Sequence, residues 1–206
     1  FLFVYVAPFP LFMVGLSLGA GAGIIASASG MVMAAVLGGA FAALLFGVIH
    51  ALPAWLVVRQ ALQNHPRADG SLAWYPPGFV LSGLAVLTTV LFAAAAIAIW
   101  GAGGTLTETI SANLEQTLTS IMPSVPIAHR QALLAGIIPY FPGLVGVAWI
   151  ITTAINGTLA QALLKRTGKN LRPSPYFADL DAPDWLSWAI AASAVVALIG
   201  PGDLGY

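Results

Sequence analysis

The chain has 206 residues, of which 59% are hydrophobic and only 7% are charged. Soluble globular domains carry about 25% charged residues, and an ionised side chain is costly in hydrocarbon, so the composition indicates an integral membrane protein. The net charge is zero and cysteine is absent, which excludes a basic face for nucleic acid, disulfide bonds and thiolate metal sites.

An uncharged apolar stretch opens the chain, because the first acidic or basic residue is Arg59. A helix of about 20 apolar residues crosses a bilayer, so residues 1–58 hold nearly three crossings. The first predicted span covers residues 1–18. Pro8 and Pro10 break it, since each proline removes a backbone donor and clashes with the preceding turn.

Small residues recur every four positions along the second predicted span, residues 19–37. This spacing forms a ridge that another helix can approach closely, either a helix of this chain or one of a separate membrane subunit. Gly38-Gly39 is the predicted turn into a third span, residues 40–62, which contains His50 and Pro53. The ridge consists of Ala22, Ala26, Gly30 and Ala34.

A polar loop, residues 63–75, follows the third span and contains the turn signal Asp69-Gly70. Trp74 and Tyr75 at its end are typical of the headgroup level of a membrane. The fourth predicted span is residues 79–100.

An amphipathic helix is predicted for residues 105–122. Thr105 and Glu108 have the spacing of a capping box, which marks where the helix begins. Its apolar residues fall on one face, so we expect the helix to lie along the membrane surface. That face consists of Leu106, Ile110, Leu114, Leu118 and Ile121.

Residues 127–164 are apolar and too long for one span. Pro139 and Pro142 divide them into a short entry helix and a fifth span, residues 143–164. Trp185 begins a sixth span that ends near Ile199.

These segments predict an all-α integral membrane bundle of about six transmembrane helices, with broken helices and one amphipathic surface helix. We expect a single domain over residues 1–206, and an upstream segment as well, because the chain begins inside an apolar run. Six of the seven basic residues fall in loops on one side, which makes that side cytoplasmic and favours the bacterial inner membrane. The six are Arg59, Arg67, Lys165, Arg166, Lys169 and Arg172, and the seventh is Arg130.

Polar side chains inside the predicted spans are the candidate ligand-binding residues. A buried polar group in a membrane needs a partner. Two interpretations therefore stay open: hydrogen bonds between helices, or a polar ligand site near the midplane beside a broken helix, as in many transporters. These residues are His50, Asn156, Thr152, Thr153, Thr88 and Thr89.

An enzyme is the least favoured alternative. Ser29 precedes a glycine and lies across the predicted turn from His50, as in an intramembrane serine protease of rhomboid type. The glycine that lies two residues before the serine in that pattern is replaced by Ser27, however, and no second polar cluster suggests an oxyanion hole. The histidines are scattered, so no metal site is predicted, and no motif indicates a cofactor.

Three stretches of the chain form a recognisable set: Ala7-Pro8-Phe9-Pro10-Leu11, Trp74-Tyr75-Pro76-Pro77-Gly78, and the basic loop at residues 165–173 before Pro183-Asp184-Trp185. Together they resemble the YybS-like family of bacterial multi-pass membrane proteins, whose function is unknown. That family is distantly similar to the substrate-binding S components of energy-coupling-factor transporters, which are six-helix bundles.

The resemblance implies a substrate-binding membrane subunit, with a second membrane subunit and an ATPase as partners beside the lipid bilayer. S components dock through an Ala-x-x-x-Ala ridge on their first helix, and the ridge from Ala22 to Ala34 is similar but lies on the second visible span. No catalytic residue and no substrate is implied. The alternative function is a non-transporting scaffold for envelope assembly.

Overall fold

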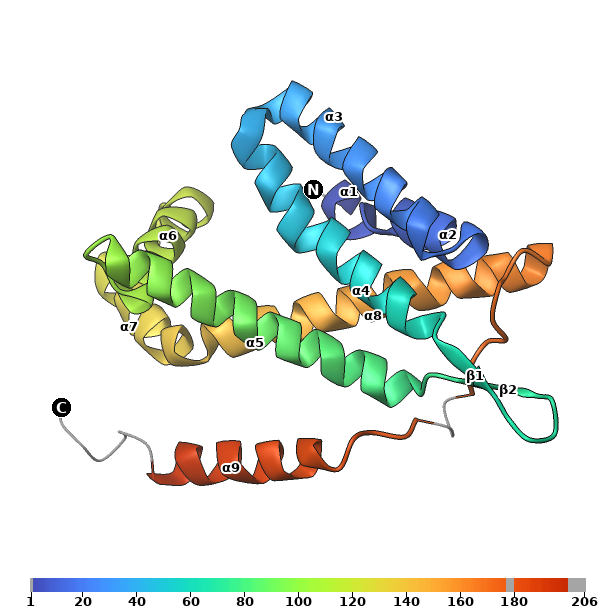
Figure 1. Cartoon of the computed structure of the whole chain (residues 1–206). Helices are drawn as coiled ribbons and strands as arrows, with labels where there is room; N and C mark the ends of the chain where they lie inside the picture. The colour runs from blue at the N-terminus through green and yellow to red at the C-terminus, as the bar shows by residue number, and fades with distance from the viewer. Residues whose placement is uncertain (1, 177–179, 200–206) are drawn as a thin grey trace. The chain divides into compact units, whose positions relative to one another are not determined.

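The computed structural model describes residues 2–176 and 180–199, and nearly all of its regular structure is helical (Figure 1). The prediction of an all-α membrane protein is therefore confirmed. The chain divides into two compact units. The terminal unit joins Phe1–Leu84 to Thr153–Tyr206, and the central unit is Ala85–Thr152. The single domain expected over the whole chain stays a prediction.

Three apolar helical stretches of the described chain are long enough to cross a membrane: Ala20–Ala61, Pro77–Gly101 and Ile127–Thr167. The first is a hairpin, and each of its arms still has the length of about 20 residues that one crossing needs. Val4–Leu18 and Trp185–Val195 are shorter apolar helices. The expected total of about six crossings stays a prediction.

The first apolar segment forms two short helices in place of one span, α1 (Leu2–Val6) and α2 (Phe9–Leu18). The break falls at Ala7 and Pro8, where the proline pair predicts it. Helix α2 ends at Gly19, whose φ of 100° turns the chain into the next helix, α3.

A helical hairpin dominates the terminal unit (Figure 1, blue to cyan). Helix α3 (Ala20–Phe46) is interrupted at Gly39, which has φ 80° and ψ −179°, a conformation that L side chains rarely adopt. The second arm returns along the first, because a side chain added at Gly30 would meet the Phe46 ring. The predicted turn at Gly38-Gly39 is therefore confirmed.

The second arm contains a π-helical turn, η1 (Gly47–Ala51), before α4 (Leu52–Ala61). The Leu52 amide donates to the Gly47 carbonyl five residues back instead of four. Pro53 follows directly and can neither donate nor tolerate the carbonyl four residues before it. The wider turn accommodates this proline inside a continuous arm.

The core of the terminal unit lies where α2, the second hairpin arm and α8 (Phe141–Thr167) meet. Phe12 and Ala160 are completely buried there. A side chain at Gly15 would come within 2.7 Å of Val58, so α2 and α4 are in close contact. The buried cluster is Leu11, Phe12, Leu16, Ala51, Ala54, Val58, Ala61, Ala160 and Leu164.

The expected polar loop after the hairpin is in fact a short antiparallel β-hairpin of β1 (Asn64–Pro66) and β2 (Leu72–Trp74). Its turn lies at the predicted signal, because Gly70 has a φ of 81°. The Asp69 carboxylate accepts hydrogen bonds from the Ser71 amide at 2.9 Å and from the Ser71 hydroxyl at 2.7 Å.

The central unit contains most of α5 (Pro77–Gly101), then α6 (Leu106–Ile121), α7 (Ile127–Ile137), the 3-10 turn η2 (Ile138–Tyr140) and the start of α8. The capping box of α6 is confirmed. The Glu108 amide donates to the Thr105 hydroxyl at 3.2 Å, and the Thr105 amide donates to the Glu108 carboxylate at 2.9 Å.

The one-sided face of α6 is also present. Leu106, Ile110, Leu114 and Leu118 are half-buried, whereas most of the other α6 side chains are exposed. Ile121, the fifth predicted member of this face, is 68% exposed at the end of the helix. The α6–α7 connection is fixed by Arg130, which is 8% exposed and donates to the Val125 carbonyl at 2.9 Å. Helix α9 (Trp185–Ile199) closes the described chain and begins where the sequence predicts.

Candidate functional site

His50, the first predicted ligand-binding residue, lies in the π-helical turn η1 and is half-buried. Its ring packs against the Phe46 ring one turn earlier, with 5.6 Å between the centroids. Pro53 explains why His50 lies in an irregular turn, and π-helical turns are frequent at functional sites.

Asn156 on α8 is 5% exposed and donates through its side-chain amide to the Tyr5 carbonyl at 2.8 Å. Tyr5 lies on α1, whose last carbonyls lose the amide partners of a continuing helix at the proline break. The bond therefore ties α8 to the broken helix. It is a hydrogen bond between helices, which is the first of the two interpretations that the sequence leaves open for this residue.

The four threonines are distributed over both units. Thr153, 3% exposed, belongs to the terminal unit with Asn156. Thr88, Thr89 and Thr152 belong to the central unit. The hydroxyls of Thr89 and Thr152 donate to carbonyls of their own helices, at 3.0 Å and 2.8 Å. The six residues predicted for one ligand site are thus divided between two units.

Ser29, the nucleophile of the protease alternative, is exposed, and its hydroxyl donates to the Ile25 carbonyl at 2.9 Å. In the described structure this hydroxyl is bonded within its own helix and not to His50. No group of three His, Asp or Glu residues in the described part of the chain is placed to hold a metal ion.

The small-residue ridge of α3 faces the chain itself over part of its length. Gly30 lies against the Phe46 ring, and Ala26 packs against the terminal-unit core. All four members are half-buried rather than open. These four are Ala22, Ala26, Gly30 and Ala34.

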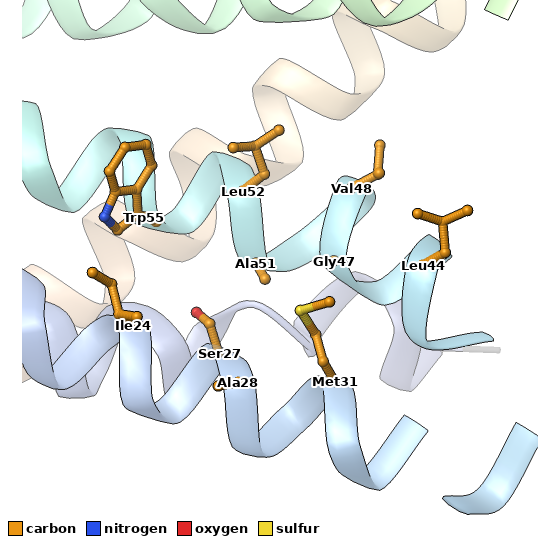
Figure 2. Close-up of a pocket in the computed structure, with 10 residues that line it drawn as sticks. All are labelled: Ile24, Ser27, Ala28, Met31, Leu44, Gly47, Val48, Ala51, Leu52 and Trp55. Atoms are coloured by element: carbon orange, nitrogen blue, oxygen red, sulfur yellow. The ribbon is translucent and has the colours of Figure 1, made fainter. Parts of the chain in front are cut away.

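A groove that sequence reasoning missed lies between the two arms of the hairpin, and we call it the hairpin groove (Figure 2). It has a volume of about 450 Å³ and opens along one side. One arm contributes Ile24, Ser27, Ala28 and Met31, and the other contributes Leu44, Gly47, Val48, Ala51, Leu52 and Trp55.

Ser27 is the one hydroxyl in the lining of the hairpin groove. It is 9% exposed, and Figure 2 shows its oxygen directed from α3 towards the opposite arm. Small residues at Gly47 and Ala51 leave the space between the arms. The only sequence signal for the groove is therefore the pairing of small residues across the Gly39 turn.

Trp55 lines one end of the hairpin groove, and Arg59 lies one helical turn further along α4. The Arg59 guanidinium carbon is 5.2 Å from the centre of a Trp55 ring, within the range of a cation–π contact. Arg59 itself is exposed. The apolar groove therefore ends beside an accessible positive charge.

A second cluster of polar groups surrounds Arg172, which follows α8 and is 6% exposed. Its guanidinium donates to the Ala61 carbonyl at 2.8 Å and lies 5.6 Å from the Trp74 ring centre. Gln161 donates to the Arg172 carbonyl at 2.8 Å. Burial lowers the pKa of Arg172 from its ordinary value. Arg172 therefore fastens the loop after α8 to the end of α4 and to the β-hairpin.

A comparison with protein families matches residues 1–205 to the family described as "Predicted membrane protein (DUF2232)". The match covers both units and all the residues considered above. No curated protein and no solved structure matches the chain.

Proposed function

The chain belongs to the DUF2232 family of predicted membrane proteins, and on this premise we propose that it is the substrate-binding subunit of a small-molecule transport system. We place its substrate in the hairpin groove. The resemblance to the YybS-like family and to S components supports a binding subunit, and it supplies the expected partners, a membrane subunit and an ATPase.

The observation that carries the proposal is the hairpin groove itself. Its volume of about 450 Å³ falls within the range of small-molecule sites, about 300–1,000 Å³. It lies between two helical arms and next to the irregular turn η1, so it is built on regular elements with one local distortion. Such distortions are tolerated in a membrane where they line a cavity or are covered by protein.

The lining indicates an apolar substrate portion, which differs from the polar ligand expected at His50 and Asn156. Of the ten residues around the groove, only Ser27 and Trp55 carry a polar side-chain group, a hydroxyl and an indole N–H respectively. Asn156 is bonded to Tyr5, so we propose that it holds helices together. His50 then supports the arm from which Ala51 and Leu52 reach the groove.

We propose the bacterial inner membrane as the location, with several crossings. The β-hairpin and the loop after α8 would be cytoplasmic, because six of the seven basic residues lie in them or in the last turns of α4 and α8 that lead into them. The absence of cysteine makes this testable by single substitutions. With an impermeant maleimide on spheroplasts, Asn113→Cys should be labelled and Asn64→Cys should not. The reverse pattern would invert the orientation.

A scaffold for envelope assembly is the second candidate. The Asn156–Tyr5 bond favours the scaffold, because this buried polar side chain joins two helices and does not face a ligand site in this interpretation. The protease alternative has no comparable support, since the Ser29 hydroxyl is bonded to its own helix.

The experiment is photolabelling of the full chain in lipid nanodiscs with a long-chain alkyl diazirine, followed by peptide mapping. The labels should concentrate on the groove-lining segments of the two arms. Ala28→Trp fills the groove at an exposed position and should remove this labelling. Ile25→Trp is the matched control, because Ile25 is 70% exposed on the same helix and does not line the groove. Equal labelling of the two variants would favour the scaffold.

A further inference from the structure

Two polar side chains, one in the hairpin groove and one just beyond its end, limit the chemical class of its substrate. The groove extends along the second arm from Leu44 to Trp55, which corresponds to a length of about 17 Å at 1.5 Å per residue. This suits one extended hydrocarbon chain. Arg59 lies just beyond the Trp55 end, and the opposite end lies towards the Gly39 turn.

Arg59 supplies charge complementarity at that end. A guanidinium binds phosphate or carboxylate oxygens through two parallel hydrogen bonds. Its contact with the Trp55 ring holds it beside the groove, and its exposure leaves its donors accessible. Trp and Arg near a helix end are also typical of the interface between hydrocarbon and headgroups. An anionic head group is the ligand feature that uses this arrangement.

Ser27 supplies the second observation. Serines inside helices commonly donate to the carbonyl four residues back, as Ser29 and Ser193 do here. Ser27 forms no hydrogen bond in the described structure, although it is 9% exposed and its oxygen points into the groove (Figure 2). The hydroxyl can therefore donate to an acceptor on a ligand that lies in the groove.

The spacing of the two groups is compatible with one molecule. The Arg59 guanidinium lies over Trp55, and Figure 2 shows the Ser27 oxygen directed towards the part of the second arm between Ala51 and Trp55. Ala51 and Trp55 are four residues apart, about 6 Å along the helix axis. An ester carbonyl is separated from a phosphate by a distance of this order in a lysophospholipid.

We propose that the hairpin groove binds a single-chain anionic amphiphile of the lysophosphatidic acid type. The acyl chain would lie along the groove, the ester oxygen would accept a hydrogen bond from Ser27, and the phosphate would bind Arg59. This inference rests on the proposed function, because it takes the groove to be a ligand site, and it adds the chemical class of the substrate.

The test is a titration of the purified full chain in detergent, with bound ligand counted by native mass spectrometry. The probes are palmitoyl lysophosphatidic acid, monopalmitoylglycerol without the phosphate, hexadecyl phosphate without the ester, and two-chain dipalmitoyl phosphatidic acid. Lysophosphatidic acid should bind at least fivefold more tightly than monopalmitoylglycerol, the scale expected for one arginine near an anionic head group. The two-chain lipid should bind more weakly than the single-chain one.

The variants assign each preference to a residue. Arg59→Gln should remove the phosphate preference and Arg59→Lys should keep most of it. Arg67→Gln, at an exposed basic position on the β-hairpin, is the matched control and should change nothing. Ser27→Ala should weaken the binding of lysophosphatidic acid and leave the binding of hexadecyl phosphate unchanged. The unchanged binding of hexadecyl phosphate also shows that the groove is still folded.

The outcomes separate the two proposals. If Ala28→Trp blocks all the single-chain probes but the parent binds monopalmitoylglycerol as tightly as lysophosphatidic acid, the groove is a ligand site and the anionic head group is wrong. If the phosphate preference depends on Arg67 and not on Arg59, or if the two-chain lipid binds equally well, the inference is also wrong. If Ala28→Trp changes no binding, both the inference and the proposed function fail.

Discussion

The terminal and central units use their polar groups differently. In the terminal unit, Asn156 bonds to Tyr5 and Arg172 bonds to Ala61, so residues more than a hundred positions apart are joined. In the central unit, two polar contacts are local: the capping box of α6 and the bond from Arg130 to Val125. The two terminal-unit bonds therefore depend on packing between distant segments, whereas these two central-unit contacts depend on residues that lie close together in the sequence.

Loss of core packing in the terminal unit should have the largest effect on the free energy of unfolding. Phe12 is completely buried at the centre of the terminal-unit core, so Phe12→Ala leaves a cavity among α2, α4 and α8. We expect the free energy of unfolding to fall by about 3 kcal/mol, measured by denaturant titration in detergent. Phe41→Ala is the control, because Phe41 is 70% exposed. Equal losses in the two variants would contradict a core at Phe12.

Removal of the Arg172 side chain should have the next largest effect. Arg172→Ala leaves the Ala61 carbonyl without this donor and detaches the loop after α8. A hydrogen bond from a charged group contributes about 2 kcal/mol, and we expect a loss of that size in the same titration. Lys169→Ala, in the same loop but exposed, should cost almost nothing. A neutral Arg172→Ala would mean that this loop does not hold the terminal unit together.

The features that the sequence predicts well are those that depend on nearby residues. The break at Pro8, the turn at Gly39 and the capping box at Thr105 all follow from local backbone chemistry. Strands of three residues are too short to show alternation, so the β-hairpin after α4 was predicted only as a loop with a turn.

The candidate site was harder to predict for a physical reason. Polarity inside a span marks His50 and Asn156 in the sequence, but the partner of a polar group depends on which helices pack together. Asn156 turned out to bond to the broken helix α1. The hairpin groove is apolar and arises from small residues that meet across a turn, so no polar motif indicates it.

A smaller effect is expected from the Asn156 side chain. Asn156→Ala removes one interhelical hydrogen bond, and such bonds in a membrane bundle contribute about 0.6 kcal/mol on average. Thr158→Ala, whose hydroxyl is bonded only within α8, is the control. The same denaturant titration measures both. A loss for Thr158→Ala as large as that for Asn156→Ala would remove the special role of the bond to Tyr5.

The smallest effect should come from acidification of the β-hairpin turn. Hydrogen bonds from Ser71 lower the pKa of Asp69 from its ordinary value of 3.8. The stabilisation of the turn is therefore complete above that value and is lost as the pH falls through the lower pKa of the folded state. Amide exchange at Ser71, compared with its unstructured rate at each pH, should show less protection below this range. Asp69→Asn should show no such change with pH.

Fluorescence quenching at Trp55 tests the ligand site in the hairpin groove most directly. A lysophosphatidic acid with a brominated acyl chain should quench part of the fluorescence of the full chain, because bromine quenches only indoles in close contact. Trp55→Phe should abolish the ligand-dependent quenching, whereas Trp188→Phe, at a position 77% exposed on α9, should preserve it. Quenching that persists at full strength in Trp55→Phe would contradict binding in the groove.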